Sequence, residues 1–155
     1  MMSYPQFKRD LQHIHESEVF GLASFETAAR FTRDTERKEK WLTLAALEEQ
    51  TLQRYLDYMR ETNQAVVEPA GWRLMGYGAG AGLAILPWRL SMKTLVDATA
   101  KFQVIFQRLM QNSEETHRDF FAYVFAHEKA IEAFAKKELS KDRNSLKAVN
   151  SLLAA

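Results

Sequence analysis

The sequence contains no cysteine, only three prolines and only six glycines among its 155 residues. The absence of cysteine excludes disulfides, thiolate metal ligands, thiol nucleophiles and iron–sulfur clusters, and it fits a reducing compartment. Net charge is nearly absent as well, at +1, so no basic field favours nucleic acid as a partner. The first ten residues lack the apolar stretch of a secretory signal. We therefore expect a cytoplasmic protein that does not bind nucleic acid.

Strand-like alternation, hairpin signals and internal repeats are also lacking, whereas apolar residues recur at helical spacing. The pattern predicts a first helix from Tyr4 or Pro5 to Phe31 and a second over about 41–63, with Asp34 or Thr35 as its cap. A third helix begins or bends at Pro87, and a fourth, capped by Ser113, runs to about residue 139. A short C-terminal helix follows over about 146–153.

Four long amphipathic helices with one long apolar crossover between the second and the third are typical of the ferritin-like four-helix bundle. The chain length and its hydrophobic fraction of 46% suit one core. The sequence therefore predicts an all-α fold in which residues 1–155 form a single ferritin-like helical domain.

Each of the four apolar stripes is interrupted by one polar residue. Glu18 lies midway between Ile14 and Leu22, and Glu48 lies midway between Leu44 and Leu52. Thr99 and His127 take corresponding positions in the third and fourth helices. A buried carboxylate costs several kcal/mol unless it is paired, hydrogen-bonded, protonated or metal-bound.

Two interpretations of these interruptions stay open. Glu18 and Glu48 would lie at the edges of their stripes and pair with arginines, or would share a proton with each other. Alternatively, Glu18, Glu48 and His127 converge from three helices as metal ligands. Two carboxylates and one imidazole leave coordination positions open for water or substrate, as a catalytic metal requires.

Two short segments resemble those of a known family. The run His15-Glu16-Ser17-Glu18-Val19-Phe20-Gly21 resembles the first-helix segment of the demethoxyubiquinone hydroxylases, which are ferritin-like di-iron monooxygenases. The run Glu48-Glu49-Gln50-Thr51-Leu52 resembles their second-helix segment, and the similarity extends over about residues 11–135. The resemblance implies a di-iron carboxylate relative, an oxidoreductase acting on an apolar substrate.

The chain departs from that family at three of six ligand positions. Thr51, Thr99 and Val124 stand where the family has a histidine and two glutamates. The resemblance therefore implies an altered metal site, with iron in a mononuclear or incomplete di-iron centre. Glu114 and His117 also have Glu-x-x-His spacing, but they lie at a helix start, where an acid favours the helix dipole.

Other acids and histidines are predicted to be peripheral. An alternative site on the same helix would use His127 with Glu128 and Glu132, but these two acids are expected to form a solvated edge with Lys129 and Lys136. His13 and His15 point to different sides of the first helix, and both are expected at the surface.

The crossover at residues 72–88 consists almost entirely of apolar and small residues between Arg73 and Arg89, and it resembles the apolar crossover with which the hydroxylase family meets the membrane. Its apolar run is shorter than the roughly 18–20 residues of a membrane span. Three interpretations stay open: a buried crossover, a self-association surface, or a peripheral membrane contact flanked by Trp72 and Trp88. Glycines four residues apart would allow close helix packing if the segment is helical.

Two functions follow as hypotheses. The first is a metal-dependent oxidoreductase that acts on an apolar small molecule. The second is a non-catalytic helical bundle that binds a lipid-like ligand or a partner helix. In either case we expect a homo-oligomer.

Overall fold

The computed structural model describes residues 2–155, and all regular structure among them is helical. The helices are α1 (Tyr4–Phe31), α2 (Thr35–Glu61), α3 (Ala70–Ile85), α4 (Trp88–Asn112), α5 (Arg118–Leu139) and α6 (Lys147–Leu153), with a single 3₁₀ turn, η1 (Glu115–His117), before α5. The predicted all-α class is confirmed, and the helices form a bundle.

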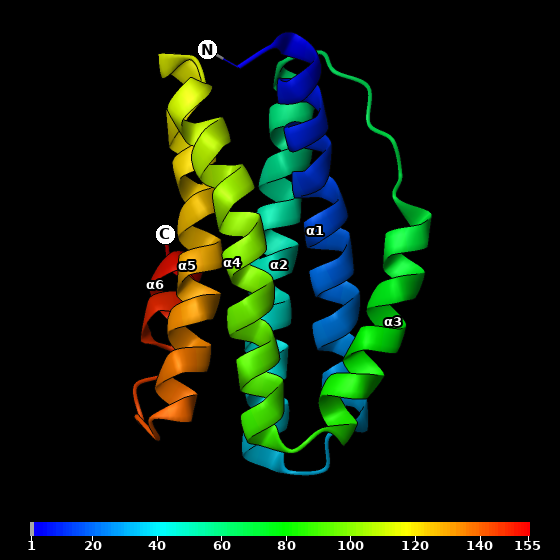
Figure 1. Cartoon of the computed structure of the whole chain (residues 1–155), viewed down its shortest axis with the longest axis vertical. Helices are drawn as coiled ribbons and strands as arrows, with labels where there is room; N and C mark the ends of the chain where they lie inside the picture. The colour runs from blue at the N-terminus through cyan, green and yellow to red at the C-terminus, as the bar shows by residue number, and fades with distance from the viewer. Residues whose placement is uncertain (1) are drawn as a thin grey trace.

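The four long helices α1, α2, α4 and α5 lie lengthwise beside one another (Figure 1). α1 and α2 run in opposite directions, and the crossover through α3 then returns the chain to the end where α2 began. As a result α4 runs parallel to α2, and α5 runs back antiparallel to α4 (Figure 1). α6 packs on α5 and α2.

Local signals account for most helix ends. Ser3 caps α1 by accepting a hydrogen bond from the backbone N–H of Gln6 at 3.3 Å. Asp34 caps α2 through the N–H of Arg37 at 2.9 Å, so this alternative for the cap is confirmed. Pro87 directly precedes α4, as predicted.

The cap predicted at Ser113 is wrong. The Ser113 hydroxyl donates instead to the carbonyl of Met110 at 2.9 Å, closing the end of α4. The chain then passes through η1, so α5 begins at Arg118, four residues later than a cap at Ser113 implied.

The apolar core is divided into two clusters along the bundle. One contains Phe25, Trp41 and Phe134, and the other contains Tyr55, Phe106 and Phe121. The four polar interruptions predicted from the sequence are all buried, and along each helix they lie between residues of one cluster and residues of the other. The bundle therefore holds a polar layer between two apolar halves.

The crossover helix α3 lies against α1 and exposes its other side. Gly76 and Gly80 face α1 so closely that an added Cβ would meet the Cβ of Ala23 or of Thr27, each at 2.7 Å. Gly78 and Gly82 have no neighbouring atom within 4 Å at that position. The interpretation of 72–88 as a buried crossover is therefore wrong: one face is buried and the other is exposed.

No helix among residues 2–155 combines the length and the hydropathy that crossing a bilayer would require.

Candidate metal centre

The structure brings Glu18, Glu48 and His127 together from α1, α2 and α5. The Nε2 atom of His127 lies 3.1 Å from Oε2 of Glu48 and 3.3 Å from Oε2 of Glu18. The exposed fractions of the three residues are 0%, 3% and 0% in sequence order. The three side chains that were predicted to converge therefore meet inside the bundle.

Glu128 is a fourth member of this cluster, which sequence reasoning missed. Its Oε1 lies 3.9 Å from Nε2 of His127. Glu18, His127 and Glu128 each offer one atom such that all three atoms lie within 4.8 Å of one another. The solvated edge predicted for Glu128 is wrong, since only 4% of the residue is exposed. For Glu132 the prediction is confirmed, because this residue pairs with Lys129 and Lys136, each at 3.3 Å.

A backbone contact orients the imidazole. Nδ1 of His127 lies 3.0 Å from the carbonyl oxygen of Val124, one turn earlier on α5. A carbonyl can only accept, so Nδ1 carries the proton and donates to it. Nε2 therefore faces the carboxylates, where it either donates a second proton or offers its lone pair to a metal.

Burial and mutual repulsion hold protons on the cluster. Burial, followed by the charge of Glu48, raises the pKa of Glu18 well above its usual range. Burial likewise raises the pKa of Glu128 to about 8, although His127 opposes the shift. Burial alone would lower the pKa of His127, but Glu48 raises this pKa to about 9. In the absence of metal, protons thus neutralise charge that a cation would otherwise balance.

Lysine and arginine side chains do not balance this charge. Among the described residues, no lysine or arginine nitrogen lies within 4.0 Å of the carboxylates of Glu18, Glu48 or Glu128. The predicted alternative of pairing with arginines is therefore wrong. Oε2 of Glu18 is fully buried and makes no hydrogen bond, although Nε2 of His127 lies 3.3 Å from it. A buried acceptor without a hydrogen bond fits a divalent cation, since carboxylate and imidazole ligands suit iron and manganese.

The three residues that stand at ligand positions of the hydroxylase family add no ligand here. The Thr51 hydroxyl donates to the Leu47 carbonyl at 2.9 Å, and the Thr99 hydroxyl donates to the Val96 carbonyl at 3.0 Å. Val124 contributes only its backbone carbonyl, to His127. The donor set is therefore three carboxylates and one imidazole, against the four carboxylates and two histidines of a full di-iron centre.

Gly21 leaves room for the carboxylate of Glu48. A Cβ atom at residue 21 would lie 2.5 Å from Oε1 and 2.7 Å from Cδ of Glu48. Gly21 stands one helical turn after Glu18 on α1, so the two helices can bring both acids to the same place. Any larger residue at position 21 would push Glu48 away from His127.

An apolar cavity of about 250 Å³ leads to this cluster from the side of α3 and α4. Small or apolar residues line most of it, among them Ala79, Leu83 and Ala98, and Phe102 adds an aromatic wall. Gly21, Glu48, Thr99 and Glu128 also line it. The arrangement of an apolar chamber ending on buried acids is typical of small-molecule sites.

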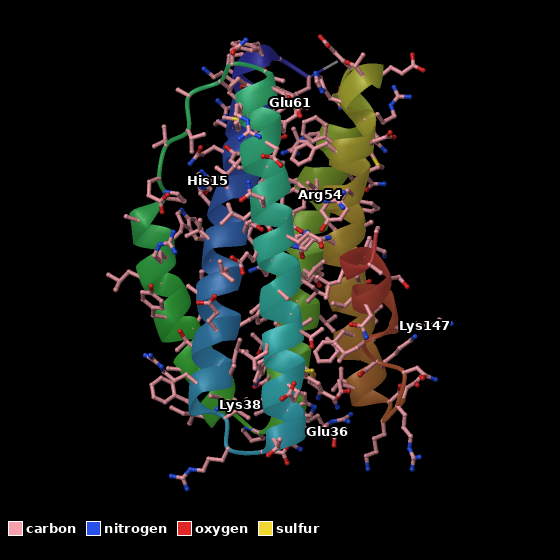
Figure 2. The ribbon with its side chains drawn as sticks, turned by 180° about the vertical axis from the view of Figure 1, so that it is seen from behind. His15, Glu36, Lys38, Arg54, Glu61 and Lys147 are labelled. Carbon is pink, nitrogen blue, oxygen red and sulfur yellow. The ribbon has the colours of Figure 1, made fainter. Side chains whose placement is uncertain are left out.

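The remaining histidines lie elsewhere. His13 is partly exposed and pairs with Glu16 at 3.1 Å, as expected of a surface residue. The surface position predicted for His15 is wrong: its exposed fraction is 2%, and its ring lies 4.9 Å from that of Tyr55. In Figure 2 it lies on the part of α1 that faces the crossover. The ring of His117 packs edge-on against Tyr58, and Glu114 is exposed, so this pair adds nothing to the centre.

Comparison with protein-family models, curated proteins and solved structures finds no match to this chain.

Proposed function

We propose that this protein is a ferritin-like relative of the di-iron carboxylate oxygenases that holds a single transition-metal ion, iron in the first instance, and oxidises an apolar small molecule. The observation that carries the proposal is the position of His127: its Nε2 lies within 3.1–3.9 Å of three buried carboxylates. The direction of the four long helices, with one crossover, supports the ferritin-like assignment (Figure 1).

Each residue has a distinct part in this proposal. Glu18, Glu128 and His127 supply the ligand atoms that lie closest to one another, and Glu48, held against Gly21, is the fourth donor. Val124 keeps the lone pair of Nε2 directed at the ion. Bound iron would supply the one-electron redox chemistry that the side chains lack. The apolar lining of the chamber would hold an apolar substrate with its reacting part beside Glu48 and Glu128.

Metal loading tests the proposal. The purified protein is incubated anaerobically with Fe(II), or with Mn(II), passed through a desalting column and analysed for metal by mass spectrometry. We expect close to one ion per chain in the wild type and loss of the ion in Glu18→Gln, which keeps the shape of the side chain but weakens its donor. Glu26→Gln, at an exposed position of the same helix, is the matched control and should bind like the wild type. A wild type without metal contradicts the proposal.

The alternative function is a non-catalytic bundle that binds a lipid-like molecule in the same chamber. It is favoured by the apolar lining of the cavity and by the missing ligands. An apolar fluorescent probe that binds equally well to the wild type and to Glu18→Gln, with neither protein taking up metal, would select this alternative.

We propose further that the outer face of α3 contacts a membrane surface. Leu74, Met75 and Ile85 have exposed fractions of 72%, 57% and 83%, and such a continuous apolar patch marks an interaction site. Lys93, on the first turns of α4, is exposed and would meet anionic headgroups.

Flotation with liposomes tests the α3 contact. The wild type should float, and the double variant Leu74→Gln, Ile85→Gln should lose most of this binding. Val104→Gln replaces an equally apolar residue on α4 that is 62% exposed, and it should float like the wild type. If the wild type remains with the unbound protein and instead elutes as a dimer that the double variant disrupts, the face is a self-association surface.

A further inference from the structure

A second cavity, of about 690 Å³, lies at the end of the bundle where α2 and α4 begin and α5 ends. Glu36, which lines it, marks this end in Figure 2. No residue of the metal centre lines it, and ten of its twelve lining residues are charged or aromatic, the other two being Met92 and Leu139. This cavity is therefore a site separate from the metal centre.

The acidic residues of this cavity are already engaged. Lys40 bridges Glu36 at 3.0 Å and Glu138 at 2.9 Å, and Glu138 also accepts a hydrogen bond from the indole N–H of Trp88 at 2.9 Å. Asp34 accepts the capping hydrogen bond at the start of α2. Asp142 accepts from the backbone N–H of Asn144 at 2.8 Å. These contacts tie α2, α4 and α5 together at the base of the cavity.

Four basic side chains around the same cavity have no such partner. They are Arg37, Arg89, Lys141 and Arg143. Within residues 2–155, none of them has a carboxylate oxygen within 4.0 Å. The Arg37 guanidinium lies over the Trp88 ring, 5.0 Å from its centroid, which leaves its N–H groups free to donate. Arg89 has only a long contact of 3.5 Å, to the carbonyl of Leu139.

We propose that this cavity binds a ligand that carries a phosphate group. Guanidinium groups match phosphate oxygens with paired N–H donors, and several cations around a concave surface concentrate anions there. The base is rigid because Lys40 and Trp88 are fixed on Glu138, so the cations on the rim surround a defined space. The proposal is independent of the metal and of the outer face of α3.

The experiment has two arms, because a phosphate group can belong to a soluble molecule or to a lipid headgroup. In the first arm, binding of pyrophosphate to the full chain is measured by calorimetry at low ionic strength. In the second arm, binding to phosphatidylcholine vesicles is measured with and without phosphatidylglycerol. Both arms use the triple variant Arg89→Gln, Lys141→Gln, Arg143→Gln. The control triple variant Lys8→Gln, Lys101→Gln, Arg118→Gln removes the same charge from exposed positions that do not line the cavity.

The proposal predicts about tenfold or greater weakening in the cavity variant and little change in the control variant. Pyrophosphate binding with this pattern identifies a soluble phosphorylated ligand. Binding that appears only with phosphatidylglycerol, with the same pattern, identifies a lipid headgroup. Failure of both arms, or equal weakening in the two triple variants, overturns the proposal, since net charge rather than the cavity would then explain any binding.

Discussion

Replacing Glu128 with glutamine is expected to stabilise the metal-free protein while it weakens metal binding by about tenfold or more. Glutamine keeps the size of the side chain but removes a charge that the apo-protein can hold only at a cost. Replacing buried charges with neutral groups of similar volume often stabilises a protein by roughly 1–4 kcal/mol. We expect a gain at the lower end of that range, because the amide still needs hydrogen-bond partners.

The gain should depend on pH in a defined direction. Burial raises the pKa of Glu128 to about 8 from a reference value of 4.5, so the folded protein keeps a proton that the unfolded chain has released. Stability is then highest below the unfolded pKa and falls as pH rises toward 8. His127 acts in the same direction: against burial, Glu48 raises its pKa to about 9 from 6.5. The wild type without metal should therefore lose stability between about pH 5 and pH 9.

Urea unfolding of the wild type and of Glu128→Gln across this range, in the presence of a chelator, measures both effects. The two stability curves should diverge as pH rises, because the variant lacks one of the buried groups whose raised pKa causes the loss of stability. Glu132→Gln is the control on the same helix. It breaks ion pairs to Lys129 and Lys136, and so it should cost up to about 1 kcal/mol and show no such divergence. If Glu128→Gln is instead less stable than the wild type at every pH, Glu128 is a structural residue.

Helical periodicity was enough to predict which side chains meet in the centre from three of the four helices. Glu18, Glu48 and His127 occupy stripe positions whose apolar neighbours are buried, and burial of the neighbours forces burial of the polar residue between them. Glu128 also lies between apolar residues of one helical face, because Val124 precedes it by four residues and Ile131 follows it by three. Its charged neighbours along the chain favoured a surface position, but adjacency in sequence says little about the face of a helix.

The burial of His15 and the position of α3 depend on tertiary contacts that the sequence pattern does not encode. His15 is buried because Tyr55 packs against its ring and the crossover lies on that side of α1. α3 is apolar on nearly all sides, so its sequence has no stripe to distinguish the buried face from the exposed one. Only the contacts of Gly76 and Gly80 with α1 make that distinction.

The approach of α3 to α1 leads to the second large prediction, for Gly80→Ala. A Cβ at residue 80 would clash with the carbonyl oxygen of Ser24 and lie 2.7 Å from the Cβ of Thr27. Because backbone atoms cannot move aside as a side chain can, α3 has to shift away from α1, at a cost of roughly 1–3 kcal/mol. The shift would also widen the apolar chamber, since Ala79, Gly82 and Leu83 of α3 line it.

Gly78→Ala, on the same helix, is expected to have the opposite effect on the stability of the protein. Position 78 has open space around an added Cβ, so the substitution should only improve helix propensity and stabilise by about 0.5–1 kcal/mol. Thermal unfolding of the two variants beside the wild type should therefore place one transition below it and the other above it. Equal effects of the two substitutions would mean that α3 does not rest on α1 through its glycines. The chamber would then lose the wall that α3 provides, and with it the structural reason for an apolar substrate beside the buried acids.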